Sequence, residues 1–191
     1  MTTSHSNDDG ATARSRCIPL TWPELQSIIS AGDLHKLARS EEQMQTYRKA
    51  RSKIKSEWES IYDYLLYTKF QFLLDEDNGQ KKRSKPTFKE WQNDRRKDGK
   101  TRIVLSLNDF PYYFEEGIEH WVVWKLGGDI STIEIENGKM EILKKADCSN
   151  VELINDSSVF LHWLNPPELK SLPDVDHIHI LFRRTVINQL C

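Results

Sequence analysis

The chain has 191 residues, with 27 Lys or Arg against 29 Asp or Glu and a formal net charge of −2. This length predicts about one domain, and no apolar stretch approaches the ~18 residues that cross a membrane. The 6 Trp, 6 Tyr and 7 Phe, beside only 8 Gly and 7 Pro, exclude collagen-like and wholly disordered chains. We therefore expect a soluble protein with a well-filled core.

The N-terminal segment, residues 1–17, predicts a disordered tail before a single domain over residues 18–191, with a polar linker at about residues 75–86. The tail lacks the apolar run of a secretory signal, and Asp8 and Asp9 argue against a mitochondrial presequence. The expected location is the cytoplasm, with the nucleus as a further candidate.

The cysteines are few and far apart in the sequence: Cys17, Cys148 and Cys191. An odd, sparse set without a C-x-x-C pair argues against a disulfide framework and against a structural zinc site. We expect three unpaired thiols in a reducing compartment.

Two capping boxes predict the first long helices. Thr21 and Glu24 have the spacing that satisfies the first amides of a helix, and Gly32 ends that helix. Ser40 opens a second box, after which an apolar stripe predicts one long amphipathic helix to about residues 72–74. The stripe consists of Met44, Tyr47, Ile54, Trp58, Ile61, Tyr62, Leu65 and Leu66.

The most basic part of the chain is residues 81–102, with ten basic and three acidic residues. Thr87 and Glu90 form a further capping box there and predict a short helix. Such a run could be a nuclear-localisation or polyanion-binding patch. A solvated loop and an outer helix face are the simpler interpretation, so nucleic acid is not an expected partner.

The second half of the chain is rich in β-branched and aromatic residues. Strands are expected at Ile103–Leu107, Ile118–Leu126, Val159–Leu164 and Asp176–Arg183. Partial alternation over residues 130–143, around Asn137 and Gly138, predicts a hairpin. Helices followed by strands indicate an α+β fold with a mostly antiparallel sheet.

The candidate site is centred on two alternating histidines. His177 and His179 leave the same face of a strand, roughly 7 Å apart at their bases, and His120 is a third member if its strand is adjacent. Imidazoles in this arrangement could hold a divalent metal or a phosphate, or act as general acid and base. Hydrogen bonding within a wet sheet face is the structural alternative.

Four further residues are predicted to complete this site. Asn165 and Ser171, in a Pro-rich connection that leads to His177, would orient a ligand, and Arg183 would meet an anionic group. Trp124 shares the face of His120 and would form an apolar wall, whereas Trp121 points to the other face. The remaining tryptophans divide into Trp163, which flanks the site, and Trp22, Trp58 and Trp91, which are expected in the core.

A combination of short motifs extends over nearly the whole chain beyond residue 18. The motifs are Trp22–Leu25, Gly32–Leu34, Leu37–Ser40, Asn108–Tyr112, Gly117–Trp124 and Asn165–His179. Together they resemble the fungal N-acetylglucosamine-induced protein family. The resemblance implies a fungal protein of about this size and supplies no catalytic residues.

A second similarity is to the histidine-triad nucleotide hydrolases and transferases, which alternate three histidines on one strand. In this chain the alternation stops at two, because Val175 and Leu181 occupy the two positions where a third histidine would stand. The nucleotidyl-transfer mechanism of that family is therefore not supported by the motif.

Three functions remain open from the sequence. The first is a pocket for a small polar ligand that contains a sugar or a phosphate, centred on His120, His177 and His179. The second is a metal-dependent or histidine-based phosphoester hydrolase at the same residues. The third is a non-enzymatic protein-interaction module that uses the long helix and residues 81–102.

Overall fold

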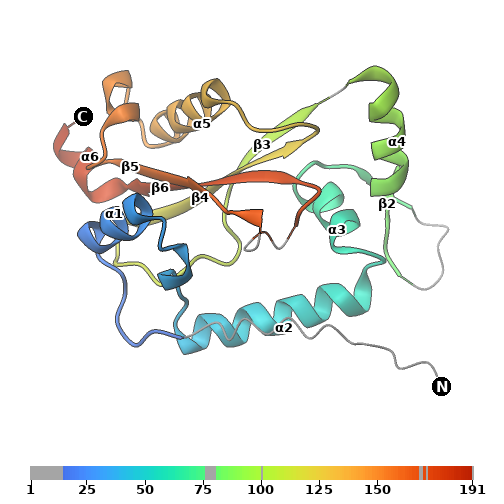
Figure 1. Cartoon of the computed structure of the whole chain (residues 1–191), viewed down its shortest axis with the longest axis horizontal. Helices are drawn as coiled ribbons and strands as arrows, with labels where there is room; N and C mark the ends of the chain where they lie inside the picture. The colour runs from blue at the N-terminus through green and yellow to red at the C-terminus, as the bar shows by residue number, and fades with distance from the viewer. Residues whose placement is uncertain (1–14, 76–80, 100, 168–169, 171, 191) are drawn as a thin grey trace.

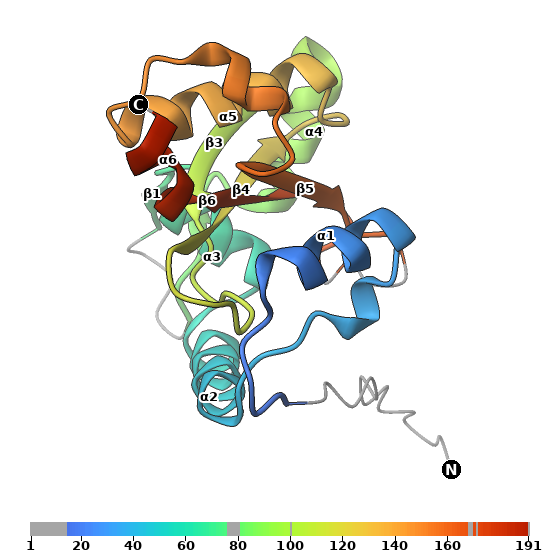
Figure 2. The ribbon, with the colours of Figure 1, turned by 90° about the vertical axis from the view of Figure 1, so that its left-hand side faces the viewer.

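A computed structural model describes residues 15–75, 81–99, 101–167, 170 and 172–190. Its centre is a four-stranded antiparallel sheet in the order β3-β4-β6-β5, made of Arg102–Leu107, Ile118–Leu126, Asp176–Arg183 and Phe160–Leu164. Helix α5 lies on one side of the sheet, and α1, α2 and α3 lie on the other (Figures 1 and 2). The α+β fold with helices before the sheet is confirmed.

The predicted strands are confirmed almost to the residue. Strands β4 and β6 have the predicted bounds, and β3 and β5 each differ by one residue at their first position. A separate two-stranded ladder pairs β1 (Leu73–Leu74) with β2 (Ser84–Lys85). Strand β2 therefore lies inside the segment predicted as a polar linker, of which residues 76–80 are outside the described part.

Helix α1 (Trp22–Ala31) follows its sequence signals. Glu24 accepts hydrogen bonds from the amide and the hydroxyl of Thr21, and Gly32 ends the helix at a φ of 72°. That left-handed conformation favours glycine, because other residues meet steric hindrance there. A short 3₁₀ turn, η1 (Leu34–Lys36), follows.

The single long helix predicted from residue 40 is two helices, α2 (Glu41–Glu57) and α3 (Ile61–Thr68). Trp58 leaves the helical conformation at a φ of −113° and a ψ of 147°, and Ser60 then caps α3 by accepting from the Asp63 amide. At the break Trp58 is buried, and its ring centroid lies 5.5 Å from that of Tyr64 in α3. Periodicity alone could not detect a cap in the middle of the stripe.

The predicted hairpin at residues 130–143 is wrong, because this segment is helix α5 (Thr132–Lys145). Ser131 and Glu134 form a capping box at its start. Ile135, Ile142 and Leu143 follow helical spacing and pack on the sheet. The Asn-Gly pair sits inside the helix, where tertiary packing overrides its turn preference.

The remaining helices are short. Helix α4 (Phe88–Asp98) begins at the predicted Thr87 and Glu90 box, a 3₁₀ turn η2 (Val151–Asn155) follows α5, and α6 (Arg184–Leu190) follows β6 directly. Buried Asp63 accepts from the hydroxyl of Ser84 at 2.8 Å and from the amide of Phe88 at 3.3 Å. It thereby joins α3 to β2 and α4.

The buried apolar residues form one cluster on the α5 side of the sheet and two clusters on the opposite side. On the α5 side, Trp121, Val123, Ile178 and Ile180 meet Ile142 and Leu143. On the other side, α1 packs on Leu161, Trp163 and Leu181, while α3 and α4 pack near Leu126 and Val175. No helix among the described residues combines the length and apolar character needed to cross a bilayer.

The cysteines differ from the expectation of three unpaired thiols. Cys17 is free and exposed, but Cys148 is disulfide-bonded. The prediction is therefore wrong for Cys148, because separation along a sequence says nothing about distance in the fold. Cys191 is outside the described residues.

Candidate functional site

The three predicted histidines lie on one face of the sheet, opposite α5. In the β4–β6 register, Trp124 pairs with His177 and Val122 with His179, so the side chains of His120, Trp124, His177 and His179 share a face. The predicted convergence is therefore present. All three histidines are buried, however, with exposed fractions of 3% for His120, 3% for His177 and 7% for His179.

Hydrogen bonds determine which ring nitrogens of this cluster carry a proton. The Trp163 indole N–H donates to Asn165 Oδ1 at 3.0 Å, which orients the amide so that its Nδ2 donates to His179 Nε2 at 3.2 Å. A neutral His179 then carries its proton on Nδ1 and donates to His120 Nε2, 2.9 Å away. Both ring nitrogens of His179 are thus used inside the protein.

Aromatic rings enclose the same cluster. Trp163 stacks on His179 with ring centroids 4.8 Å apart, and Tyr112 stacks on His120 at 5.8 Å. Trp124 stacks on His177 at 5.0 Å, while His177 Nδ1 donates to the Val175 carbonyl at 2.9 Å. The Trp124 ring thus covers one side of His177.

Burial lowers the pKa of all three histidines. It is the main cause for His179, whose pKa falls to about 3, and for His120, whose pKa lies well below the usual 6.5; the charge of Arg39 acts in the same direction on both. Burial also lowers the pKa of His177, against the opposing hydrogen bond to the Val175 carbonyl. Near neutral pH the cluster is uncharged.

The described residues contain no group of three or more His, Cys, Asp or Glu that could hold a metal ion. The ring centroids lie 5.1 Å apart for His120 and His179 and 5.5 Å for His177 and His179. The His179 nitrogens already bond to Asn165 and His120, so a metal would have to displace the hydrogen bonds just described.

The other predicted site residues have different positions. Arg183 does share the strand face of His177 and His179, and its guanidinium carbon lies 5.8 Å from the Trp22 ring centroid. Asn165 contacts His179, and its predicted role in orienting a ligand stays a prediction. Ser171 is outside the described residues, so its predicted role stays a prediction.

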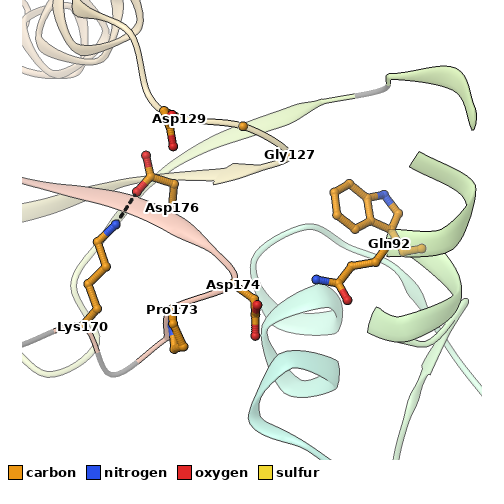
Figure 3. Close-up of a pocket in the computed structure, with 9 residues that line it drawn as sticks. Gln92, Gly127, Asp129, Lys170, Pro173, Asp174 and Asp176 are labelled. Carbon is orange, nitrogen blue, oxygen red and sulfur yellow. Dashed lines mark hydrogen bonds and ion pairs between the residues drawn. The ribbon is translucent and has the colours of Figure 1, made fainter. Parts of the chain in front are cut away.

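An open pocket lies at the end of these strands, with a volume of about 280 Å³. We call it the strand-end pocket; it is lined by Trp91, Gln92, Gly127, Gly128, Asp129, Lys170, Pro173, Asp174 and Asp176. One of its lining residues, Asp176, directly precedes His177 in β6. Figure 3 shows Asp129 close to Asp176, and Gln92 pointing toward Asp174.

Hydrogen bonds hold part of the pocket lining in place. Asp176 accepts from Lys170 Nζ at 3.0 Å and from the Ile130 amide at 2.8 Å. Burial acts to raise the pKa of Asp176, but these two donors more than offset it, so the net pKa is lowered. Asp176 is consequently a fixed carboxylate.

The far side of the pocket rests on stacked aromatic rings. Trp91 stacks on Phe88 at 6.2 Å, and Phe88 stacks on Tyr62 at 4.4 Å. Burial raises the pKa of Tyr62 to about 12, and a hydrogen bond with Asp174 contributes to that rise. Trp91 is half-buried: it packs against the core cluster that contains Leu66 and Phe88, as expected, and it also lines the pocket.

Sequence reasoning missed most of the strand-end pocket. Two signals pointed toward it: the Gly127-Gly128 pair directly after a strand, and the Pro-rich connection that contains Lys170 and Pro173. Gly127 and Gly128 have φ angles of 90° and 82°, which favour glycine and turn the backbone away from the sheet. Nothing in the sequence showed that α4 brings Trp91 and Gln92 to this turn.

Comparison with known proteins identifies the family. The family model described as "Protein of unknown function (DUF3605)" matches residues 21–183. The chain belongs to the DUF3605 family. This match covers the sheet, the histidine cluster and the strand-end pocket.

Two fungal proteins are similar in sequence to this DUF3605 chain. The chain is 28% identical over 178 residues to N-acetylglucosamine-induced protein 1 of Candida albicans, covering 86% of this chain and 68% of the relative. It is 26% identical over 166 residues to an uncharacterized protein of Saccharomyces cerevisiae, covering 84% and 77%. The resemblance seen in the sequence motifs is thereby confirmed.

A solved structure shares the DUF3605 fold seen here. The crystal structure of HTC1 superimposes with a TM-score of 0.53 at 19% identity, covering 88% of this chain and 93% of that chain. At this identity the likeness concerns the fold alone.

Proposed function

We propose that the protein binds a small sugar, uncharged or bearing an amino group, in the strand-end pocket. The observation that carries the proposal is the pairing of an aromatic face, Trp91, with polar groups across an open cavity: Gln92, Asp129 and Asp174. Sugars present apolar C–H faces and a ring of hydroxyls, so an indole and several fixed acceptors complement them.

The charge of the lining favours such a ligand over a phosphorylated one. Three carboxylates, Asp129, Asp174 and Asp176, face the pocket with one ammonium, Lys170. Lys170 is already paired with Asp176, so a phosphate would meet net negative charge. Of the two ligand classes expected from the sequence, the sugar is therefore the one proposed.

Asp129 is the group best suited to accept from a ligand. Its carboxylate makes no hydrogen bond within the described part of the chain, whereas its backbone carbonyl accepts from Lys125 Nζ at 2.7 Å. The backbone is thus anchored while the carboxylate remains available. The Candida relative is named for induction by N-acetylglucosamine, which makes that amino-sugar derivative the first ligand to test.

The test is titration calorimetry with N-acetylglucosamine, glucosamine, glucose and a sugar phosphate. We expect binding of at least one of the three unphosphorylated sugars, weaker or no binding of the phosphate, and a loss of roughly tenfold or more in Trp91→Ala. Trp91→Phe keeps an aromatic face and should retain most of the affinity. Absence of binding by all three sugars overturns the proposal, as does preference for the phosphate.

A matched control separates the pocket from general charge effects. Glu42 is an exposed carboxylate on α2, far from the pocket, so Glu42→Gln changes the same charge as Asp129→Asn elsewhere. We expect sugar affinity to fall only in Asp129→Asn. Equal affinities in the two variants would contradict the assigned role of Asp129.

A further inference from the structure

We infer that two copies of this chain pair through the outer edge of β3 to form a twofold dimer with a continuous sheet. Strand β3 is one edge of the four-stranded sheet, and β4 is its hydrogen-bonded neighbour among the described strands. The opposite edge, β5, is packed against α1 and η2. The inference concerns a different surface from the strand-end pocket and does not depend on it.

The ladder register shows which backbone groups of β3 are available. The Asn108 amide donates to the His120 carbonyl at 2.7 Å, and position 108 continues the β3–β4 register. Hydrogen-bonded pairs alternate along an antiparallel ladder, so positions 102, 104 and 106 bond to β4. The N–H and C=O groups of Ile103, Leu105 and Leu107 therefore point away from β4.

The side chains at these same three positions form an apolar strip on the α5 side. Ile103 is 46% exposed and Leu107 is 52% exposed, although both are large aliphatic residues. Leu105, between them, lines a groove of about 190 Å³ with Ile103, Val123 and α5 residues. Helix α5 leaves this strip open because it lies close over β4, where a Cβ at Gly138 would come within 2.8 Å of Val123 Cγ2.

The strip lacks the features that usually protect a sheet edge. Positions 103–107 contain no charge, proline or glycine. The one charged residue of β3, Arg102, places its guanidinium 4.4 Å from the centroid of the Phe72 ring. An exposed edge of this kind is a template for pairing with another strand.

The outward-facing positions of β3 are complementary to the same positions of a second copy when the two strands run antiparallel. An antiparallel pair centred on Leu105 places Ile103 opposite Leu107 of the second copy, and Leu105 opposite Leu105. These are the positions whose backbone groups point outward, so the symmetric register satisfies all of them together. Val104 then faces Ser106, and Arg102 faces the neutral Asn108, so no like charges oppose each other within the two paired strands; Glu134 and Glu141 of α5 line the adjoining groove.

The test is sedimentation equilibrium of the full chain over a wide concentration range. We expect a monomer–dimer equilibrium in the wild type. The double variant Ile103→Lys/Leu107→Lys should weaken dimerisation by roughly tenfold or more, because it sets lysine against lysine. Both residues are about half exposed, and thermal unfolding with circular dichroism checks that the variant remains folded.

A charge-swap pair tests the register itself. Ile103→Glu/Leu107→Glu should also be monomeric, but a mixture of the lysine and glutamate variants should form a heterodimer, since each lysine then opposes a glutamate. Ile133→Lys is the matched control, because Ile133 is an exposed aliphatic residue on α5 outside β3. A wild type that stays monomeric at every concentration overturns the inference, as does a dimer that neither double variant weakens.

Discussion

The histidine cluster and the strand-end pocket lie at neighbouring points of the same two strands, yet they have opposite physical characters. The cluster is closed by Trp163, Trp124 and Tyr112, and the His179 nitrogens bond to Asn165 and His120. The pocket is open and has a carboxylate, Asp129, without a hydrogen bond among the described residues. The histidines are thus buried and bonded within the protein, while polar groups at a turn line an open pocket.

A neutral, enclosed histidine pair cannot exchange protons with a ligand unless the surrounding aromatic residues open. The pocket needs no such opening. We therefore expect changes in the cluster to reduce stability and changes in the pocket to reduce ligand binding, and the following variants and conditions test that division.

The largest expected effect is a loss of stability in acid. Because the pKa values of His120 and His179 are lowered in the folded protein, the unfolded chain binds more protons below its own histidine pKa of about 6.5. Stability should be fully present above that pH and fall between pH 7 and pH 5, by about 2 kcal/mol for His179 and by a further amount for His120. Urea unfolding at a series of pH values measures this slope, and a flat profile over this interval would contradict the enclosed cluster.

The next largest effect is expected for His120→Ala. The substitution leaves a cavity between Tyr112 and Trp163 and removes the partner of His179 Nδ1, which should cost about 3 kcal/mol of unfolding free energy. His35→Ala is the control, because His35 is exposed on η1 and should change stability by less than about 0.5 kcal/mol. Equal losses in both variants would be inconsistent with the structural role of His120.

A smaller effect is expected for Asn165→Ala. The variant breaks the bonds to Trp163 Nε1 and His179 Nε2, so about 1–2 kcal/mol should be lost. The side-chain amide of Asn165 determines which ring nitrogen of His179 carries the proton. The nitrogen-15 chemical shifts of His179 should therefore change more than those of His177, and the reverse ranking would argue against the proposed proton order.

The smallest stability effect is expected for Asp129→Asn. The carboxylate has no hydrogen bond in the described part of the chain, so the free energy of unfolding should change by less than about 0.5 kcal/mol. Affinity for the unphosphorylated sugars should nevertheless fall. A large loss of stability with unchanged affinity would reverse the division between the two regions.

Local signals predicted much of the fold. The capping boxes at Thr21, Ser40 and Thr87 each start a helix, and the strands β4 and β6 have their predicted bounds. Alternation also placed His120, His177, His179 and Trp124 on one face. These features depend on residues a few positions apart, so a sequence pattern can show them directly.

The errors have the opposite cause. The residues 130–143 became a helix because Ile142 and Leu143 find a sheet surface made by strands on both sides of them in sequence. Trp91 packs against the core as expected, but it also lines the pocket because α4 lies beside the turn at Gly127. These contacts join segments that are distant in the chain, although the Ser131 and Glu134 capping box of α5 is a local signal that the prediction of a hairpin overlooked.

The sequence by itself determined that this chain has capped helices, four central strands and three histidines on one face, because caps and side-chain alternation are short-range properties. Only the tertiary structure decided that the histidines are enclosed and neutral, that an open polar pocket lies one residue away, and that β3 is an edge strand of the described sheet with Ile103 and Leu107 exposed. Burial depends on which distant elements come to cover a surface. That information belongs to the packing of the whole molecule.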